Sequence, residues 1–300
     1  MRAISQNSFG GPDVLRTIEI PRPEPGPGEV LVRVAATSVN PADWKVRAGH
    51  VLLGDPPFTL GFDVSGTVAA LGSGVTGFAV GEEVFGMVFG RFGAYAEYVV
   101  AQAESLVRKP EALDHVHAAA LPSAATTAWQ ALAGLRAGER VLIHAAAGGV
   151  GHLAVQIAVA RAAEVLGTAR ADNHEFLLGL GASELIDYRA TDFTTVVRDV
   201  DMVLDLVGGS YGARSLRVLR PQGRYVDALG SDAEGDPRYV RFYVEPSGAD
   251  LREIVALIDA GRLRVEVARV LSLAEVAEAH RISESGRVRG KIVLVPWGAA

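Results

Sequence analysis

The sequence predicts an α/β protein with two domains, one rich in β-strands and one in which strands alternate with helices. At 300 residues the chain is too long for one simple hydrophobic core and suits two. Its first hundred residues carry β-branched runs that are interrupted by proline and glycine. From about Pro110 onward, short apolar runs alternate with helical patterns, which predicts βαβ units and a parallel sheet.

The β-rich part begins with a proline-broken segment and a clear strand. Val30–Val34 is an apolar, β-branched run typical of a strand, and prolines recur before it between Pro21 and Pro27. Proline cannot occupy a central strand or a helix interior, so that preceding segment is expected to be irregular. Between Gly61 and Val84, β-branched residues are punctuated by glycines. This pattern is typical of short strands and tight turns in a barrel or sandwich.

Strands and helices then alternate along the rest of the chain. We expect strands at Val141–Ala145, Val165–Thr168, Leu185–Ile186, Met202–Val207, Tyr225–Ala228 and Lys291–Val295. We expect helices at His152–Ala163, Asn173–Leu180, Tyr211–Leu219, Ala249–Ala260 and Leu273–Ser285. The chain has no internal repeat and no low-complexity linker, so the change near Pro110 predicts a packed domain junction.

Composition excludes several classes of function. The formal net charge is −6, which argues against a nucleic-acid-binding protein because no excess of Lys and Arg neutralises phosphates. Cysteine is absent, which excludes disulfides, thiol nucleophiles, Cys-based zinc sites and iron–sulfur clusters. The sequence has neither a signal-peptide pattern at Met1 nor an apolar run long enough to cross a bilayer. We therefore expect a cytoplasmic protein that binds no membrane.

The clearest motif is a glycine-rich turn between a predicted strand and a predicted helix. Val141–Ala145 leads into an A-x-G-x-x-G sequence in which Ala146 stands where the usual dinucleotide-binding fingerprint has its first glycine. Gly148 would let the backbone approach a pyrophosphate, Gly151 would allow tight helix–strand packing, and the helix N-terminus would attract phosphate. The alternative is a glycine-rich turn without a ligand. The predicted contacts with the cofactor are Ala146, Gly148, Gly149, Val150 and Gly151.

The choice of cofactor depends on the end of the second strand of this domain. NAD enzymes usually place an acidic residue there to bind the ribose 2′-hydroxyl, but Val165–Ala169 ends without one. Thr168 could donate a hydrogen bond to a 2′-phosphate and Arg170 could pair with it, which predicts NADPH. Alternatively, Asp172 could be the acidic residue that binds the ribose, displaced by a few residues from its usual place. Its spacing to Glu175 favours a helix N-cap instead.

Further motifs occur in order along the chain. They are Asn40–Lys45, Gly61–Gly66, Ala94–Val99, Leu121–Gln130 and Gly290–Leu294. Together with the glycine motif they resemble the zinc-independent quinone oxidoreductase branch, which includes zeta-crystallin, of the medium-chain dehydrogenase/reductase superfamily. The resemblance spans nearly the whole chain and implies a Rossmann nucleotide-binding domain inserted into a GroES-like β-rich catalytic domain. It implies a catalytic domain of residues 1–115 plus 246–300 and a Rossmann domain of residues 116–245.

The resemblance also implies which residues form the catalytic site. Asn40 matches a residue whose amide approaches the nicotinamide side, Lys45 one that contacts the nicotinamide ribose and assists protonation, and Thr127 one near the nicotinamide ring. The alternatives are a turn residue before Pro41, a solvated lysine and a residue of a helix core. Asp63 is expected to be a structural hydrogen-bond acceptor.

Three more cofactor contacts follow from the same resemblance. Tyr188 matches a tyrosine that contacts the 2′-phosphate, although relatives often add a lysine where this chain has His174. Phe242 matches a segment that passes the nicotinamide and pairs across a dimer interface, so a homodimer is expected, whereas the alternative is a plain edge strand. Lys291 belongs to the closing motif and is also expected to contact the cofactor.

The chain departs from the zinc alcohol dehydrogenases, whose metal is held by Cys, His and a carboxylate. Its histidines at His50, His115 and His117 lack metal-binding spacing, so no metal is expected. An acceptor that is already electrophilic suits such a site, which predicts a small quinone or α,β-unsaturated carbonyl as substrate. Two alternatives stay open: an enoyl-thioester or polyketide enoyl reductase, and an NADPH-binding sensor or structural protein with low turnover.

Overall fold

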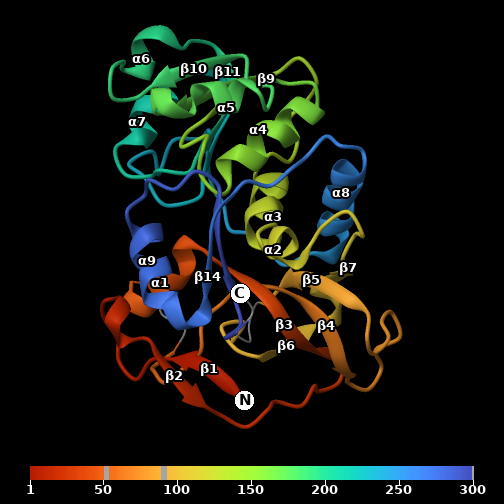
Figure 1. Ribbon diagram of the computed structural model, residues 1–300. Coiled ribbons are helices and arrows are strands. Elements are labelled where there is room, and N and C mark those ends of the chain that lie inside the picture. The colour runs from red at the N-terminus through yellow and green to blue at the C-terminus, as the bar shows by residue number, and fades with distance from the viewer. Residues whose placement is uncertain (51–53, 89–92, 299–300) are drawn as a thin grey trace. The chain divides into compact units, whose positions relative to one another are not determined.

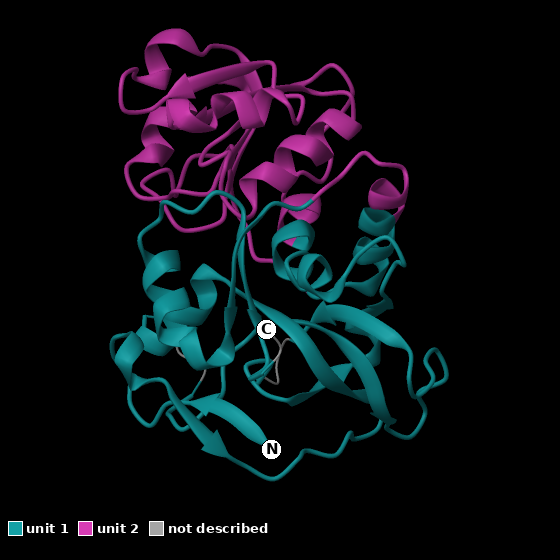
Figure 2. Ribbon diagram, viewed as in Figure 1, with its two compact units in different colours: residues 1–126, 246–255, 265–300 teal, residues 127–245, 256–264 magenta. Residues whose placement is uncertain are grey.

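The structure is a computed structural model that describes residues 1–50, 54–88 and 93–298 (Figure 1). Its internal contacts divide the chain into two compact units, which are coloured separately in Figure 2. Unit 1 comprises residues 1–126, 246–255 and 265–300, and unit 2 comprises residues 127–245 and 256–264. Helices α3 (Pro122–Ala131) and α8 (Gly248–Asp259) each contribute residues to both units.

Unit 1 is built on a mainly antiparallel sheet with the strand order β14-β15-β3-β4-β5-β7, in which β6 also pairs with β3. These strands are β3 (Glu29–Val39), β4 (Asp63–Leu71), β5 (Glu83–Met87), β6 (Tyr98–Gln102), β7 (Leu106–Arg108), β14 (Val267–Ser272) and β15 (Lys291–Val295). Strands β1 (Arg2–Ser5) and β2 (Arg16–Glu19) form a separate hairpin. The helices are α1 (Pro41–Ala48), α2 (His115–Ala119) and α9 (Val276–Glu284).

The strand expected at Val30–Val34 is confirmed as part of the longer strand β3, which lies in the middle of this sheet. The predicted strand Lys291–Val295 is β15, and it pairs antiparallel with the end of β3 through Ile292 and Val39. This register brings the C-terminal segment beside the residues that follow β3. The helix over Pro41–Ala48 was not predicted, although Asn40, Pro41 and Asp43 carry the signals of a helix start.

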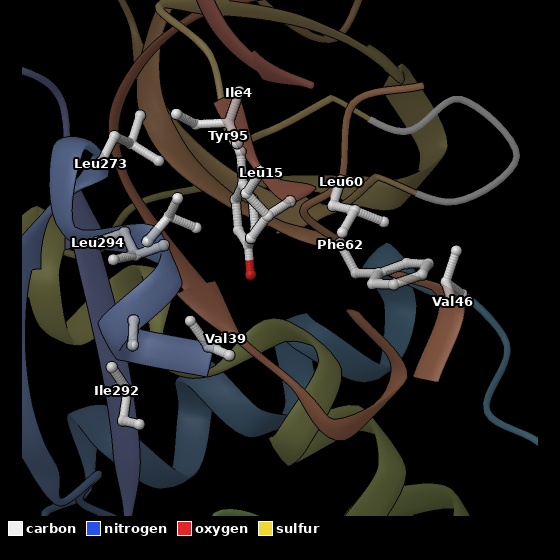
Figure 3. Packing of buried hydrophobic residues seen from close by; sticks show 12 residues of the cluster. Ile4, Leu15, Val39, Val46, Leu60, Phe62, Tyr95, Leu273, Ile292 and Leu294 are labelled. Atoms are coloured by element: carbon white, nitrogen blue, oxygen red, sulfur yellow. The ribbon is translucent and has the colours of Figure 1, made fainter. Parts of the chain in front are cut away.

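One apolar cluster joins the ends and the middle of the chain within unit 1. Figure 3 shows Ile4 from β1, Tyr95 from the segment before β6, and Leu294 from β15 among its members. Val39 and Val46 from β3 and α1 belong to the same cluster. Because these side chains are buried together, the cluster fixes the helix α1 that follows Asn40.

Unit 2 contains a parallel sheet with the order β10-β9-β8-β11-β12-β13. Its strands are β8 (Arg140–Ile143), β9 (Glu164–Ala169), β10 (Glu184–Asp187), β11 (Val200–Asp205), β12 (Leu219–Asp227) and β13 (Tyr239–Arg241). Its helices include α4 (Gly151–Ala160), α5 (His174–Leu178), α6 (Phe193–Val196) and α7 (Tyr211–Leu216). This is the doubly wound order of a Rossmann fold, and its strand order reverses between β8 and β11.

Helices pack on this sheet as the alternating pattern predicted. Helix α4 contacts β8 and β9, and α7 contacts β11 and β12. The five strands expected between residues 141 and 228 are confirmed as β8 to β12. Among the residues that the structure describes, no helix combines the length and the apolar character that a membrane crossing requires.

Candidate functional site

The glycine motif lies where the strand order of unit 2 reverses, between the end of β8 and the start of α4. Ligands of doubly wound sheets bind at this point, outside the carboxyl ends of the strands. A side chain at Gly151 would place its Cβ only 2.3 Å from the carbonyl oxygen of Ala145, so the packing of the loop itself requires glycine there. A Cβ at Gly148 would meet only that same oxygen, at 3.3 Å, so the chain alone explains Gly148 less well. The open backbone at Gly148 and the helix N-terminus fit a dinucleotide pyrophosphate.

Two neighbouring loops repeat one arrangement that sequence reasoning missed. The Asp205 carboxylate at the end of β11 accepts hydrogen bonds from the backbone N–H groups of Val207 (2.7 Å) and Gly208 (3.0 Å). The Asp227 carboxylate at the end of β12 accepts in the same way from Leu229 (2.8 Å) and Gly230 (2.7 Å). The sequence pattern Asp-x-apolar-Gly at two successive strand ends is the signal that could have identified them.

These two loops are also bonded to each other. The Gly209 N–H donates to the Gly230 carbonyl at 2.9 Å, and the Tyr225 hydroxyl donates to Asp205. Val207 and Leu229 remain 42% and 39% exposed at their tips. The paired loops therefore present an apolar surface at the carboxyl edge of the sheet, beside the glycine motif.

Arg170 and Tyr188 lie on adjacent strand ends, because β9 and β10 run parallel with Ala169 opposite Asp187. Tyr188 is 47% exposed, and the structure records no side-chain partner for Arg170 among the residues that it describes. Both side chains are thus placed where the ribose of an adenine dinucleotide is expected in this fold.

Thr168 does not fit its predicted role. Its side chain is 1% exposed, and its hydroxyl lies 3.0 Å from Nδ1 of His144, whose Nε2 lies 3.0 Å from the hydroxyl of Ser215. Burial lowers the pKa of His144 to about 3, so this histidine is neutral. The Thr168 hydroxyl satisfies a buried imidazole, so its placement does not favour the predicted contact with a 2′-phosphate.

The interpretation of Asp172 as a helix N-cap is wrong. A 3₁₀ turn over Ala171–Asn173 precedes α5, so Asp172 lies inside this turn, and no side chain caps α5 at Asn173. Its carboxylate instead lies 3.8 Å from the guanidinium of Arg189. Arg189 was not singled out from the sequence, since it belongs to no motif and comes near Asp172 only through the pairing of β9 with β10.

In unit 1, Asn40 is held by a buried cation and a buried anion. Lys291 Nζ donates to Asn40 Oδ1 at 2.5 Å, and Asn40 Nδ2 donates to Asp63 Oδ2 at 2.8 Å. An ammonium only donates and a carboxylate only accepts, so these two partners fix the orientation of the amide. Asn40 keeps one further side-chain N–H that can donate, and the residue is 8% exposed.

Lys291 is buried, with 4% exposure, and burial lowers its pKa. Its ammonium lies 3.7 Å from Asp63 and 3.4 Å from the Val39 carbonyl oxygen. These contacts do not favour the predicted direct contact between Lys291 and the cofactor, because the ammonium is enclosed within unit 1.

Asp63 is confirmed as a structural acceptor. Its carboxylate accepts from the hydroxyl of Ser38 (2.5 Å) and from the backbone N–H (2.7 Å) and hydroxyl (2.5 Å) of Ser123, besides Asn40. It thereby ties β4 to the end of β3 and to the start of α3.

Asp43 lies behind this group, in the first turn of α1. It is fully buried, and its two oxygens accept from the backbone N–H groups of Asn40 (2.7 Å) and Gly61 (3.0 Å). Desolvation by burial raises the pKa of Asp43 to about 7, although the hydrogen bond from Asn40 opposes this shift. The carboxyl group thus orients the Asn40 backbone from a position that solvent does not reach.

The remaining predicted residues are partly exposed. Lys45 Nζ lies 5.7 Å from the centre of the Trp44 ring. Thr127 lies in α3, next to Thr126, whose hydroxyl is buried without a hydrogen-bond partner among the described residues. Phe242 directly follows the edge strand β13, and its N–H donates to the Asp227 carbonyl at 2.9 Å.

Within the described ranges, no three His, Asp or Glu side chains are grouped so that they could hold a metal ion.

Comparisons with known proteins agree with this architecture. Residues 26–111 match the alcohol dehydrogenase GroES-like domain, and residues 180–294 match the zinc-binding dehydrogenase family. The 2-methylene-furan-3-one reductase of Solanum lycopersicum is 32% identical over 99% of this chain and 79% of its own length.

Two solved structures are similar over almost their whole length. The quinone oxidoreductase from Coxiella burnetii has a TM-score of 0.93 and 37% identity, over 98% of this chain and 99% of its own. The Escherichia coli quinone oxidoreductase complexed with NADPH has a TM-score of 0.91 and 28% identity, over 99% of this chain and 100% of its own. The chain therefore belongs to the medium-chain dehydrogenase/reductase superfamily, in its zinc-independent quinone oxidoreductase branch.

Proposed function

We propose that this protein is an NADPH-dependent oxidoreductase that reduces a quinone or an α,β-unsaturated carbonyl without a metal ion. The observation that carries the proposal is the glycine loop at the switch point of unit 2, in which Gly148 leaves the backbone open to a pyrophosphate. The relatives support the substrate class, because they are named as a quinone oxidoreductase and as the reductase of an exocyclic enone.

The residues of the chain have separate tasks in this reaction. Bound NADPH supplies a hydride to the electrophilic carbon of the acceptor. The loop from Ala146 to Gly151 binds the pyrophosphate, while Arg170 and Tyr188 bind the phosphorylated ribose. Lys291 and Asp63 hold the Asn40 amide in one orientation. The remaining side-chain N–H of Asn40 then donates to the oxygen of the acceptor, on which negative charge develops. Lys45 and Thr127 bind the nicotinamide half of the cofactor.

The buried ammonium of Lys291 supports a reaction without a metal ion. It supplies a positive charge 3.7 Å from Asp63, so that this carboxylate has a cation without any bound metal. The chain also contains no cysteine to complete a zinc ligand set of the alcohol dehydrogenase kind.

We also propose that the protein works as a cytoplasmic homodimer. The strand β13 lies at the edge of the parallel sheet, with Val240 exposed by 44% and Tyr243, just beyond it, by 73%. Such an apolar edge is commonly covered by a second copy. Light scattering on the purified protein tests the dimer, and a monomer at micromolar concentration would contradict it.

The decisive experiment follows NADPH oxidation with a panel of quinones, simple enones and enoyl-thioesters, before and after exhaustive chelation. We expect turnover of quinones or enones that chelation leaves unchanged, and no stoichiometric zinc in the purified protein. Preference for enoyl-thioesters would favour the first alternative, and tight NADPH binding without turnover would favour a sensor. Activity that is lost on chelation and restored by zinc would contradict the metal-free reaction.

A further inference from the structure

Beside Arg170, unit 2 carries a second cation that no sequence motif singled out. Arg189 follows β10 and is 52% exposed. Its Nε and Nη2 donate to the two oxygens of Asp187, each at 3.3 Å, and its backbone N–H donates to the same carboxylate at 3.0 Å. Asp187 thus holds the guanidinium at the carboxyl edge of the sheet. The hydrogen bonds from Arg189 lower the pKa of Asp187, so this carboxylate stays ionised.

Arg189 lies beside the strand end that contacts the ribose in Rossmann domains. The strand β9 is the second strand of the fold, and its end determines whether a Rossmann domain accepts a 2′-hydroxyl or a 2′-phosphate. Because Ala169 lies opposite Asp187, the residues after β10 lie next to Arg170 and the turn that contains Asp172. Neighbouring strands are only about 4.8 Å apart, so one phosphate can reach side chains from both strand ends.

The second contact of Arg189 is weaker than the first. Its Nη2 lies 3.8 Å from Asp172 Oδ1, which is beyond hydrogen-bond distance, and the Asp172 side chain is 68% exposed. An exposed ion pair of this kind adds little stability and is easily exchanged. A 2′-phosphate carries roughly −1.5 to −2 charge at neutral pH and offers three acceptor oxygens, so it is a stronger partner than one carboxylate.

We propose that Arg189 is a specificity-determining residue that binds the 2′-phosphate of NADPH, and that Asp172 is its competing anion. When NADPH binds, Arg189 keeps its two side-chain hydrogen bonds to Asp187 and exchanges its contact with Asp172 for one with the phosphate. Asp172 weakens NADPH binding in two ways, because it competes for Arg189 and because its negative charge repels the phosphate. This inference rests on the proposed use of NADPH.

The test measures dissociation constants for NADPH, NADH and 2′,5′-ADP by fluorescence titration and competition. The variants are Arg189→Gln and Asp172→Asn, both at exposed positions. We expect Arg189→Gln to weaken NADPH and 2′,5′-ADP about tenfold and NADH less than about twofold, since a charge-assisted hydrogen bond is lost. We expect Asp172→Asn to tighten NADPH about threefold without tightening NADH. In the double variant that gain should shrink, because Asp172 acts partly through Arg189.

Arg198→Gln is the matched control. It removes the same charge from an exposed arginine of unit 2, just before β11 begins. Among the described residues, the Arg198 side chain bonds only the carbonyls of Thr194 and Val197. Equal weakening of NADPH and NADH by Arg189→Gln, or an equal effect of the control, would overturn the inference. So would weaker NADPH binding in Asp172→Asn. If the wild-type protein bound no NADPH at all, the proposed function would fail with it, whereas normal NADPH binding by Arg189→Gln would defeat this inference alone.

Discussion

Unit 1 and unit 2 both bury carboxylates, but they satisfy them in different ways. In unit 2, Asp205 and Asp227 each accept from backbone N–H groups two and three residues further along the chain. In unit 1, Asp63 accepts from Ser38, Asn40 and Ser123, and its cation is Lys291 near the C-terminus. The backbone hydrogen bonds of Asp205 and Asp227 therefore order the loops that follow them, while the bonds of Asp63 join distant segments of the chain.

This difference predicts opposite responses to substitution. A change at an open loop position of unit 2, such as Gly148, should remove binding and leave the fold, while a change in the buried group of unit 1 should cost stability as well as activity.

Gly148→Val should remove NADPH binding, by about a hundredfold or more, and leave the protein folded. The branched side chain would fill the space that the pyrophosphate needs, while its Cβ meets only the Ala145 oxygen, at 3.3 Å. Fluorescence titration with NADPH and a thermal melt followed by circular dichroism measure the two effects. An unchanged affinity in the folded variant would show that the loop does not bind phosphate.

Gly151→Val is the matched comparison for that variant. Its Cβ would lie 2.3 Å from the Ala145 carbonyl oxygen, so the loop and helix α4 must separate. We expect destabilisation of about 3 kcal/mol or more, as for an overpacked core. Similar melting temperatures for the two variants would contradict this division of roles between the glycines.

Lys291→Met should destabilise unit 1 by about 3 kcal/mol, because a buried carboxylate loses its only nearby cation among the described residues. The amide of Asn40 would also lose the donor that fixes its orientation, so kcat should fall more than KM rises. Chemical unfolding and steady-state kinetics measure the two effects.

A second substitution separates charge from packing in that prediction. Lys291→Met combined with Asp63→Asn removes both charges and should recover much of the lost stability, while kcat stays low. If the double variant is as unstable as the sum of the two single variants, the ammonium and the carboxylate do not act as a pair.

The same contrast explains how much the sequence revealed. The glycine loop lies within residues 141–151, and the alternating strands of unit 2 are local patterns, so both were predicted. The hydrogen bonds between Lys291 and Asn40 depend on the pairing of Ile292 with Val39, and no local pattern encodes this register. Arg189 and Asp172 likewise meet only because β9 pairs with β10. Resemblance to the family named Asn40 and Lys291 but not the bond between them.

Asp43 provides the smallest expected effect and a test of burial in unit 1. Its pKa is about 7 in the folded protein and near its ordinary value of 3.8 in the unfolded chain. A group whose folded pKa is raised contributes stability at low pH and loses it as pH rises through the folded pKa. Between pH 5 and pH 7 this loss amounts to about 2 kcal/mol. Asp43→Asn, which cannot ionise, should lack it.

The measurement compares the free energy of unfolding of the wild type and Asp43→Asn from pH 5 to pH 8. Burial lowers the pKa values of His144 and His280 to about 3. These two histidines therefore make the protein less stable as the pH falls below 6.5, which is opposite to the effect of Asp43. Because both proteins contain these histidines, their effect cancels in the difference, and the remaining slope belongs to Asp43. A difference in unfolding free energy that does not change with pH reflects the side-chain amide of the variant, which the N–H groups of Asn40 and Gly61 would meet. The part of the difference that changes with pH reflects the ionisation of Asp43. Parallel stability curves over this range would show that Asp43 is already ionised at pH 5 and that its hydrogen bonds outweigh its desolvation.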